Sequence, residues 1–107
     1  MIETILKIDS SAVYSYFKNM VGQFFKILPL KENEEESLNT YMRSLQLELI
    51  GFASLVPSLN DDQRVLSLIA TLQYLIEHPE CDTSVVKREV FRSISTCNKI
   101  HSEYNPR

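Results

Sequence analysis

Four side chains of the types that bind zinc lie in one stretch of this 107-residue sequence, namely His78, Cys81, Cys97 and His101. Imidazole and thiolate groups at short spacings, here His-x2-Cys and Cys-x3-His, are typical of zinc sites. The segment between the two pairs lacks glycine and proline and is predicted to be one helix, which separates Cys81 from Cys97 by roughly 20 Å or more. Zinc ligands must all lie about 2 Å from one ion. We therefore expect no metal site within one chain and no cofactor. Cys97 and His101 could form part of a site only across two chains. A structural zinc protein remains an alternative function.

A catalytic pair is the second chemistry to consider, because Cys97 and His101 are one helical turn apart and side chains at that spacing can touch. A cysteine nucleophile also needs a cleft, an oxyanion donor and a group that orients the histidine, and the sequence indicates none of these. The acidic runs 34–36 and 61–62 stand at expected helix N-termini, where carboxylates favour the helix dipole. We predict no enzyme and no catalytic residue.

A basic stripe is the third candidate. Arg88, Arg92 and Lys99 occupy positions i, i+4 and i+11 of the last expected helix and share one outward side. Such a stripe can bind nucleic-acid phosphates or an acidic protein surface. The chain as a whole is acidic, with a net charge of −3 and a pI near 5.3, which argues against a polyanion. These three residues are candidates for an anion or an acidic partner, and a nucleic-acid-binding regulator is an alternative function.

The charges are distributed unevenly along the chain. Residues 1–31 carry four lysines against two acids (+2), residues 32–62 one arginine against seven acids (−6), and residues 63–107 six basic against five acidic groups (+1). A hydrophobic content of 44% with only two glycines is typical of a helical globular domain rather than of a sheet with tight hairpins. The longest apolar run is too short to span a membrane. We expect a cytoplasmic protein without a membrane partner, with both cysteines as free thiols.

The elements that must position these side chains are four stretches in which hydrophobic residues recur at helical spacing. We predict helices at about 10–28, 34–56, 61–78 and 83–104. Connections of about four to six residues favour antiparallel neighbours. The predicted fold class is all-α, an antiparallel up-down-up-down four-helix bundle in a single domain over residues 1–107, with residues 1–8 as a short N-terminal helix or arm.

The expected boundaries depend on prolines and capping residues. Pro29 is expected to end the first helix and Pro57 the second, because the residue before a proline disfavours the helical conformation. Polar residues that precede the apolar periodicity are expected to cap the later helices. These N-caps are Asn33, Asn60, and Asp82 or Thr83.

Three hydrophobic residues of the second helix lie off its apolar stripe, namely Leu47, Ile50 and Leu55. An apolar surplus of this kind on a small helical protein is explained either by association with another chain or by burial of this helix beneath the N-terminal arm. We predict a small cytosolic protein that acts by protein–protein interaction, as an adaptor, inhibitor, immunity-type or chaperone-like accessory protein, with itself or another protein as its partner. The candidate partner-binding residues are Leu47, Ile50 and Leu55.

Overall fold

The computed structural model describes residues 10–105, and all regular structure in that range is helical. The expected arm at residues 1–8 lies outside the described residues. No helix within 10–105 is both long enough and apolar enough to cross a membrane. The helices are α2 (Ser10–Phe25), α3 (Ile27–Glu32), α4 (Leu38–Ser54), α5 (Pro57–Asn60), α6 (Gln63–Glu77) and α7 (Thr83–Glu103).

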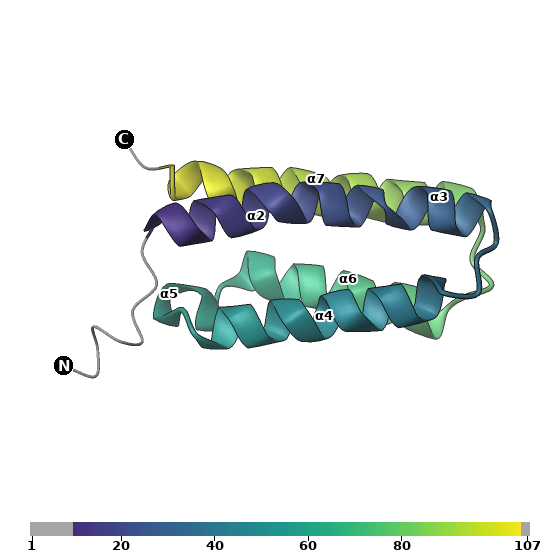
Figure 1. Cartoon of the computed structure of the whole chain (residues 1–107), viewed down its shortest axis with the longest axis horizontal. Helices are drawn as coiled ribbons and strands as arrows, with labels where there is room; N and C mark the ends of the chain where they lie inside the picture. Colours follow the sequence, from purple (N-terminus) through teal and green to yellow (C-terminus); the bar gives the residue numbers. More distant parts are fainter. Residues whose placement is uncertain (1–9, 106–107) are drawn as a thin grey trace.

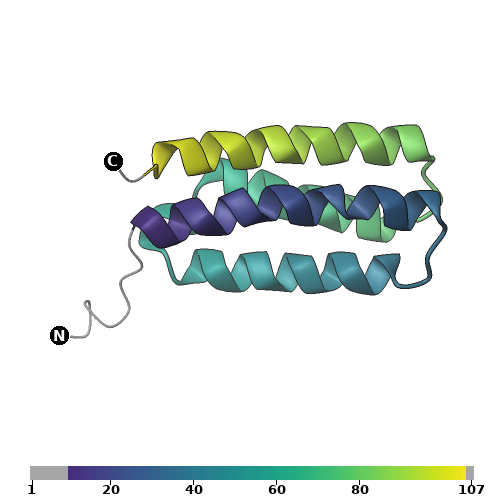
Figure 2. The same cartoon turned by 45° about the horizontal axis from the view of Figure 1, so that its top comes forward.

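The long helices run side by side along the long axis of a compact all-α domain (Figures 1 and 2). α2 and α3 lie along α7 in one layer, and α4 lies along α6 in the other. The most extensive packing joins α2 to α7, and the second most extensive joins α4 to α6. The two connections α3–α4 and α6–α7 lie at the same end of the molecule.

One hydrophobic core fills the space between these layers. Every long helix contributes residues to it at helical spacing, which explains why each segment is helical in this context. Twelve of its largest side chains are less than 2% exposed: Val13, Phe17, Met20, Phe24, Ile27, Leu49, Leu59, Val65, Leu68, Leu72, Leu75 and Ile100.

Pro29 does not end the first helical segment, so that expectation was wrong. The hydrogen-bonding pattern breaks at Lys26, whose backbone keeps helical angles, and α3 continues along the same direction with Pro29 as its third residue. A proline fits in the first turn of a helix because the amide hydrogen it lacks has no partner there. The segment therefore reaches Glu32 rather than residue 28.

Asn33 is the C-cap of α3, not the N-cap of the next helix, and α4 begins at Leu38. The amide of Glu35 donates to the carbonyl of Leu30, and Glu34 takes a left-handed conformation with φ of 52°. This pattern satisfies the last carbonyls of α3 in the way helices commonly terminate. The acidic residues 34–36 thus form a turn instead of the first turn of a helix.

Two boundaries around residues 55–62 also differ from expectation. Pro57 begins the short helix α5 at its first position rather than closing α4, which ends at Ser54. Asn60 belongs to α5, and the N-cap of α6 is Asp62, whose carboxylate accepts from the amide of Arg64 at 2.8 Å. Asp82 caps α7 as expected, accepting from the amide of Val85.

Candidate functional site

The three residues predicted to lie off the apolar stripe are all exposed in the structure, two of them within α4 and Leu55 as its C-cap. Leu47 is 69% exposed, more than any other large hydrophobic side chain among the described residues, and Leu55 and Ile50 are also exposed. Leu66 of α6 follows the buried Val65 and is 45% exposed. Its position shows that the apolar surface extends from α4 onto α6.

Hydrogen bonds between α4 and α6 fix how these exposed residues lie relative to one another. Asn39 donates to the carbonyl of Ile76 at 3.4 Å, and Gln46 donates to the carbonyl of Ile69 at 3.2 Å. In this antiparallel register Ile50 lies opposite residues 65–66. Ile50 and Leu66 are therefore neighbours on one outer surface. We call that surface the α4–α6 face; it comprises Leu47, Ile50 and Leu66. Leu55 follows the end of α4 on the side where Glu48 reaches α2, so it lies outside this face.

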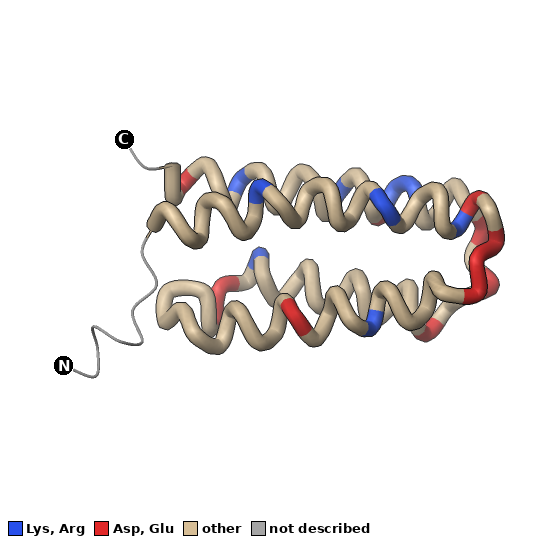
Figure 3. Tube along the Cα trace, in the orientation of Figure 1, with Lys and Arg blue, Asp and Glu red and all other residues tan. Residues whose placement is uncertain are grey.

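Few charges surround the α4–α6 face. Arg43 and Glu48 are the only charged residues of α4; Arg43 donates to Asn39, and Glu48 accepts from the Tyr16 hydroxyl on the α2 side. In Figure 3 this layer is mostly uncharged along its length. Gly51 lies four residues from both Leu47 and Leu55, and a Cβ atom there would meet no atom within 4 Å. The face is open, apolar and nearly neutral.

The structure brings two of the three basic candidates together around a carboxylate. Glu89, whose side chain is only 12% exposed, lies 3.2 Å from Arg88 and 3.5 Å from Arg92, while both arginines are 63% exposed. Lys99 is exposed two turns further along α7. Glu89 neutralises part of the stripe, and sequence spacing alone did not reveal that it faces inward.

Two exposed phenylalanines pack on each other between α2 and α7. The rings of Phe25 and Phe91 are 5.6 Å apart at 89°, an edge-to-face pair. Phe25 is 43% exposed and Phe91 is 44% exposed. We call the surface around them the α2–α7 face; it comprises Phe25 and Phe91 together with Lys18, Lys87 and Arg88.

The zinc-type residues do not converge. Cys81 precedes α7 beside His78, whereas Cys97 and His101 lie near its other end. His78 stacks on Tyr74 and bonds to its carbonyl. Across residues 10–105, no three histidine, cysteine or acidic side chains are close enough to hold a metal ion. These residues therefore give no common site within the chain.

Cys97 and His101 also lack the features of a nucleophile and its base. Cys97 is fully buried, and burial raises the pKa of its thiol to about 12, which keeps it protonated and inert near neutral pH. His101 packs edge-on against Tyr14, and its Nε2 lies 3.0 Å from the Asn98 side-chain oxygen. The pair contributes to packing at the α2–α7 seam.

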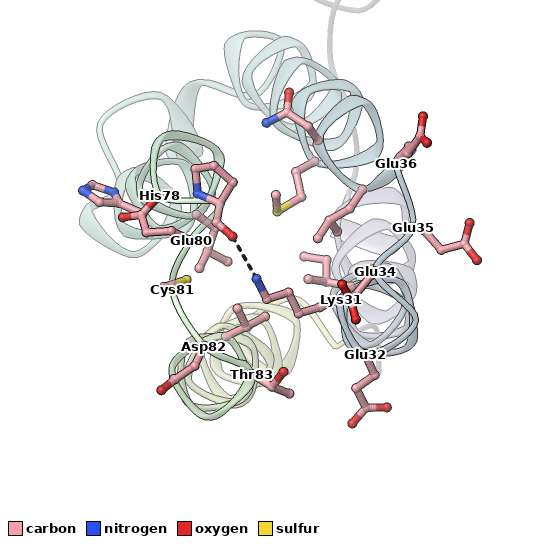
Figure 4. Close-up of a pocket in the computed structure, with 17 residues that line it drawn as sticks. Lys31, Glu32, Glu34, Glu35, Glu36, His78, Glu80, Cys81, Asp82 and Thr83 are labelled. Atoms are coloured by element: carbon pink, nitrogen blue, oxygen red, sulfur yellow. Dashed lines mark hydrogen bonds between the residues drawn. The ribbon is translucent and has the colours of Figure 1, made fainter.

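A pocket of about 570 Å³ at the acidic end of the molecule was not expected from the sequence. Its lining includes apolar residues of four helices, and Lys31 crosses it to donate to the carbonyl of Pro79 at 2.9 Å (Figure 4). Glu32, Glu35 and Glu36 point away from the pocket in this view. The sequence does not indicate this pocket, because it predicts that residues 34–36 belong to a helix. Its carboxylates do not converge on one point.

No protein-family model, no curated protein and no solved structure matches this chain. Its function is therefore inferred from the chemistry of its surfaces.

Proposed function

We propose that this chain is a protein-interaction domain that binds the apolar helical surface of another protein chain through the α4–α6 face. The observation that carries the proposal is the 69% exposure of Leu47 beside Ile50 and Leu66 on a nearly uncharged surface. Leucine and isoleucine side chains each contribute about 1.5–3 kcal/mol when fully buried. Three of them at the centre of one face supply the buried core that a protein interface needs.

The size of the face supports this function. The domain measures 48 × 25 × 20 Å along its principal axes, and α4 with α6 occupies one long side of it. A side of that size offers on the order of 1,000 Å², whereas a standard interface buries about 800 Å² on each partner. A stable complex therefore fits on this side alone.

We further propose the finer architecture and setting of the domain. Alternation of direction along α2–α3, α4, α6 and α7 supports an antiparallel up-down-up-down four-helix bundle, with α3 as an extension of α2 and α5 as part of a connection. Two free cysteines, one half-buried and one buried, are compatible with a cytoplasmic protein. The domain acts by binding, without turnover or cofactor.

The test is a native mass spectrum of the protein isolated gently from its own host, combined with sedimentation of the purified protein at rising concentration. We expect a stoichiometric complex with a second protein or a second copy. Leu47→Glu should abolish it and leave helicity unchanged by circular dichroism, because a charge on this face must lose its water on binding.

Gly22→Glu is the matched control, because it adds the same charge to an exposed helical position in the opposite layer. This control should keep the complex. A monomer in every measurement, or a complex that survives Leu47→Glu, contradicts the proposal. Unfolding of Leu47→Glu would show that Leu47 belongs to the core.

A further inference from the structure

The geometry points to a second binding surface: the α2–α7 face binds an acidic amphipathic segment of another protein, with apolar side chains of that segment on Phe25 and Phe91 and its carboxylates on Lys18, Lys87 and Arg88. This surface lies in the opposite layer from the α4–α6 face. The inference therefore does not depend on the function proposed above.

The apolar part of the surface is the edge-to-face pair of Phe25 and Phe91, whose centroids are 5.6 Å apart. Each ring is more than two-fifths exposed, although the neighbouring Phe24 is fully buried. Two aromatic rings held in contact on the surface of a folded protein form a rigid apolar platform, which is the kind of group that dominates protein interfaces.

Basic side chains flank this platform on both helices. Lys18 lies two helical turns before Phe25 on the same side of α2, and Lys87 and Arg88 lie four and three residues before Phe91 on α7. All three are exposed. An apolar centre with positive charges around it is complementary to a segment that carries apolar side chains among carboxylates.

Among residues 10–105, no carboxylate pairs with Lys18 or Lys87, whereas Arg88 shares the carboxylate of Glu89 with Arg92. Residues 10–31 contain three lysines and no acidic residue. The two acids within α7 are Glu89, which is nearly buried, and Glu103, which accepts from Arg64 of α6 at 2.6 Å. Figure 3 shows the basic residues along this layer and the acidic residues concentrated at one end of the molecule.

The ring geometry favours a protein segment over nucleic acid. In an edge-to-face pair one ring covers part of the face of the other, so the two rings do not offer a pair of open faces for stacked bases. The acidic end, with Glu32, residues 34–36 and Glu80, would also repel a polyanion that extends beyond the basic residues. A short acidic segment needs no open ring faces for stacking and can bind the basic residues without reaching the acidic end.

Gly22 allows the surface to be blocked without damage to the fold. It lies four residues from both Lys18 and Lys26 and three from Phe25, and a Cβ atom at this position would meet nothing within 4 Å. Glutamate at position 22 would place a carboxylate one helical turn from Lys18, which the segment requires. Gly51 in α4 is equally open, so Gly51→Glu is a matched control.

The experiment selects peptides from a random 12-residue library on the immobilised full-length protein. The selected peptides should be enriched in aspartate and glutamate around one or two apolar residues. Their affinity should fall at least about tenfold in Gly22→Glu and in the double variant Phe25→Ser with Phe91→Ser, and should weaken as NaCl is raised. Gly51→Glu should bind them like the unmodified protein.

Three results would overturn the inference. The first is a selection without acidic enrichment, including one that yields no peptide. The second is binding that Gly22→Glu leaves intact while Gly51→Glu removes it, which would assign the peptides to the α4–α6 face. The third is a competition experiment in which single-stranded poly(U) displaces a labelled peptide at a lower concentration than the unlabelled peptide does. That result would make nucleic acid the occupant. Thermal unfolding followed by circular dichroism confirms that each variant is folded.

Discussion

The two outer layers of this protein both expose large hydrophobic side chains, but they differ in the charges around them. On the α4–α6 face, Leu47, Ile50 and Leu66 have few charged neighbours, and Arg43 lies one helical turn before Leu47. On the α2–α7 face, two phenylalanines lie among basic residues whose nearest carboxylate, Glu89, is turned inward. An exposed hydrophobic group indicates that something covers it, and the surrounding charges indicate what kind of partner does so. One small domain therefore presents two surfaces suited to different partners.

The largest effects should separate the core from both faces. Phe24→Ala should lower the free energy of unfolding by about 3–5 kcal/mol and Leu49→Ala by about 2–5 kcal/mol, because both side chains are fully buried. Phe25→Ala and Leu47→Ala should change it by less than about 1 kcal/mol. Urea denaturation measures all four values. A loss above about 2 kcal/mol for either exposed residue would mean that this residue stabilises the fold and does not belong to a binding surface.

An ion-pair network joins the two layers, and its removal should have the next largest effect. Asp62 caps α6 and binds Arg64, which also reaches Glu103 of α7. Asp62→Ala should cost about 1–2 kcal/mol through loss of the cap. Denaturant titration of the purified variant measures this cost, and an unchanged midpoint would show that the Asp62 cap does not stabilise the domain.

The same network predicts a pH dependence. The hydrogen bond from Arg64 lowers the pKa of the Asp62 carboxyl below its ordinary value. A carboxyl with a lowered pKa in the folded state stabilises the protein above the unfolded-state pKa, and this contribution is lost as the pH falls through the folded-state pKa. Stability should therefore fall as the pH is lowered through the ordinary aspartate pKa of 3.8, and the loss should continue below it. Asp62→Asn, which can still cap the helix, should lose less stability over this range.

The two glycines should respond alike to alanine. Gly22 and Gly51 each occupy an exposed position in the interior of a helix, where an added Cβ atom would meet no atom within 4 Å. Alanine at either position should raise the free energy of unfolding by about 0.5–1 kcal/mol, because glycine loses more backbone entropy in a helix. Differential scanning calorimetry should show two similar increases in Tm. A lower Tm for either variant would show that the added methyl group is not accommodated at that position.

The smallest effect concerns the basic residues of α7. Arg92 is 63% exposed and only 3.5 Å from Glu89, and exposed ion pairs contribute little because water and salt screen them. Arg92→Ala should change the free energy of unfolding by less than about 0.5 kcal/mol in a urea titration. A larger loss would give the basic stripe a structural role instead of a binding one.

The sequence predicted the four long helical segments and placed Leu47, Ile50 and Leu55 off the core stripe, because helical periodicity depends only on residues close in the chain. It did not predict the exposure of Phe25 or Leu66. Periodicity identifies the apolar side of a helix but not how far its neighbours cover that side, which depends on the packing of distant helices. The turn at residues 34–36 was also not predicted. Glu34 takes a left-handed conformation that glycine adopts far more often, so its residue type gives no signal for that turn.

The most extensive helix pairing, α2 with α7, has a consequence for synthesis. Residues 26–82 separate the two helices in the chain, so α2 leaves the ribosome well before α7 exists. At roughly 5–20 residues per second, the apolar side of α2, including Phe17, Met20 and Phe24, remains uncovered for roughly 3–11 s before synthesis of α7 begins. During that interval the nascent chain should be a substrate for chaperones that bind exposed apolar segments, although the finished domain is not.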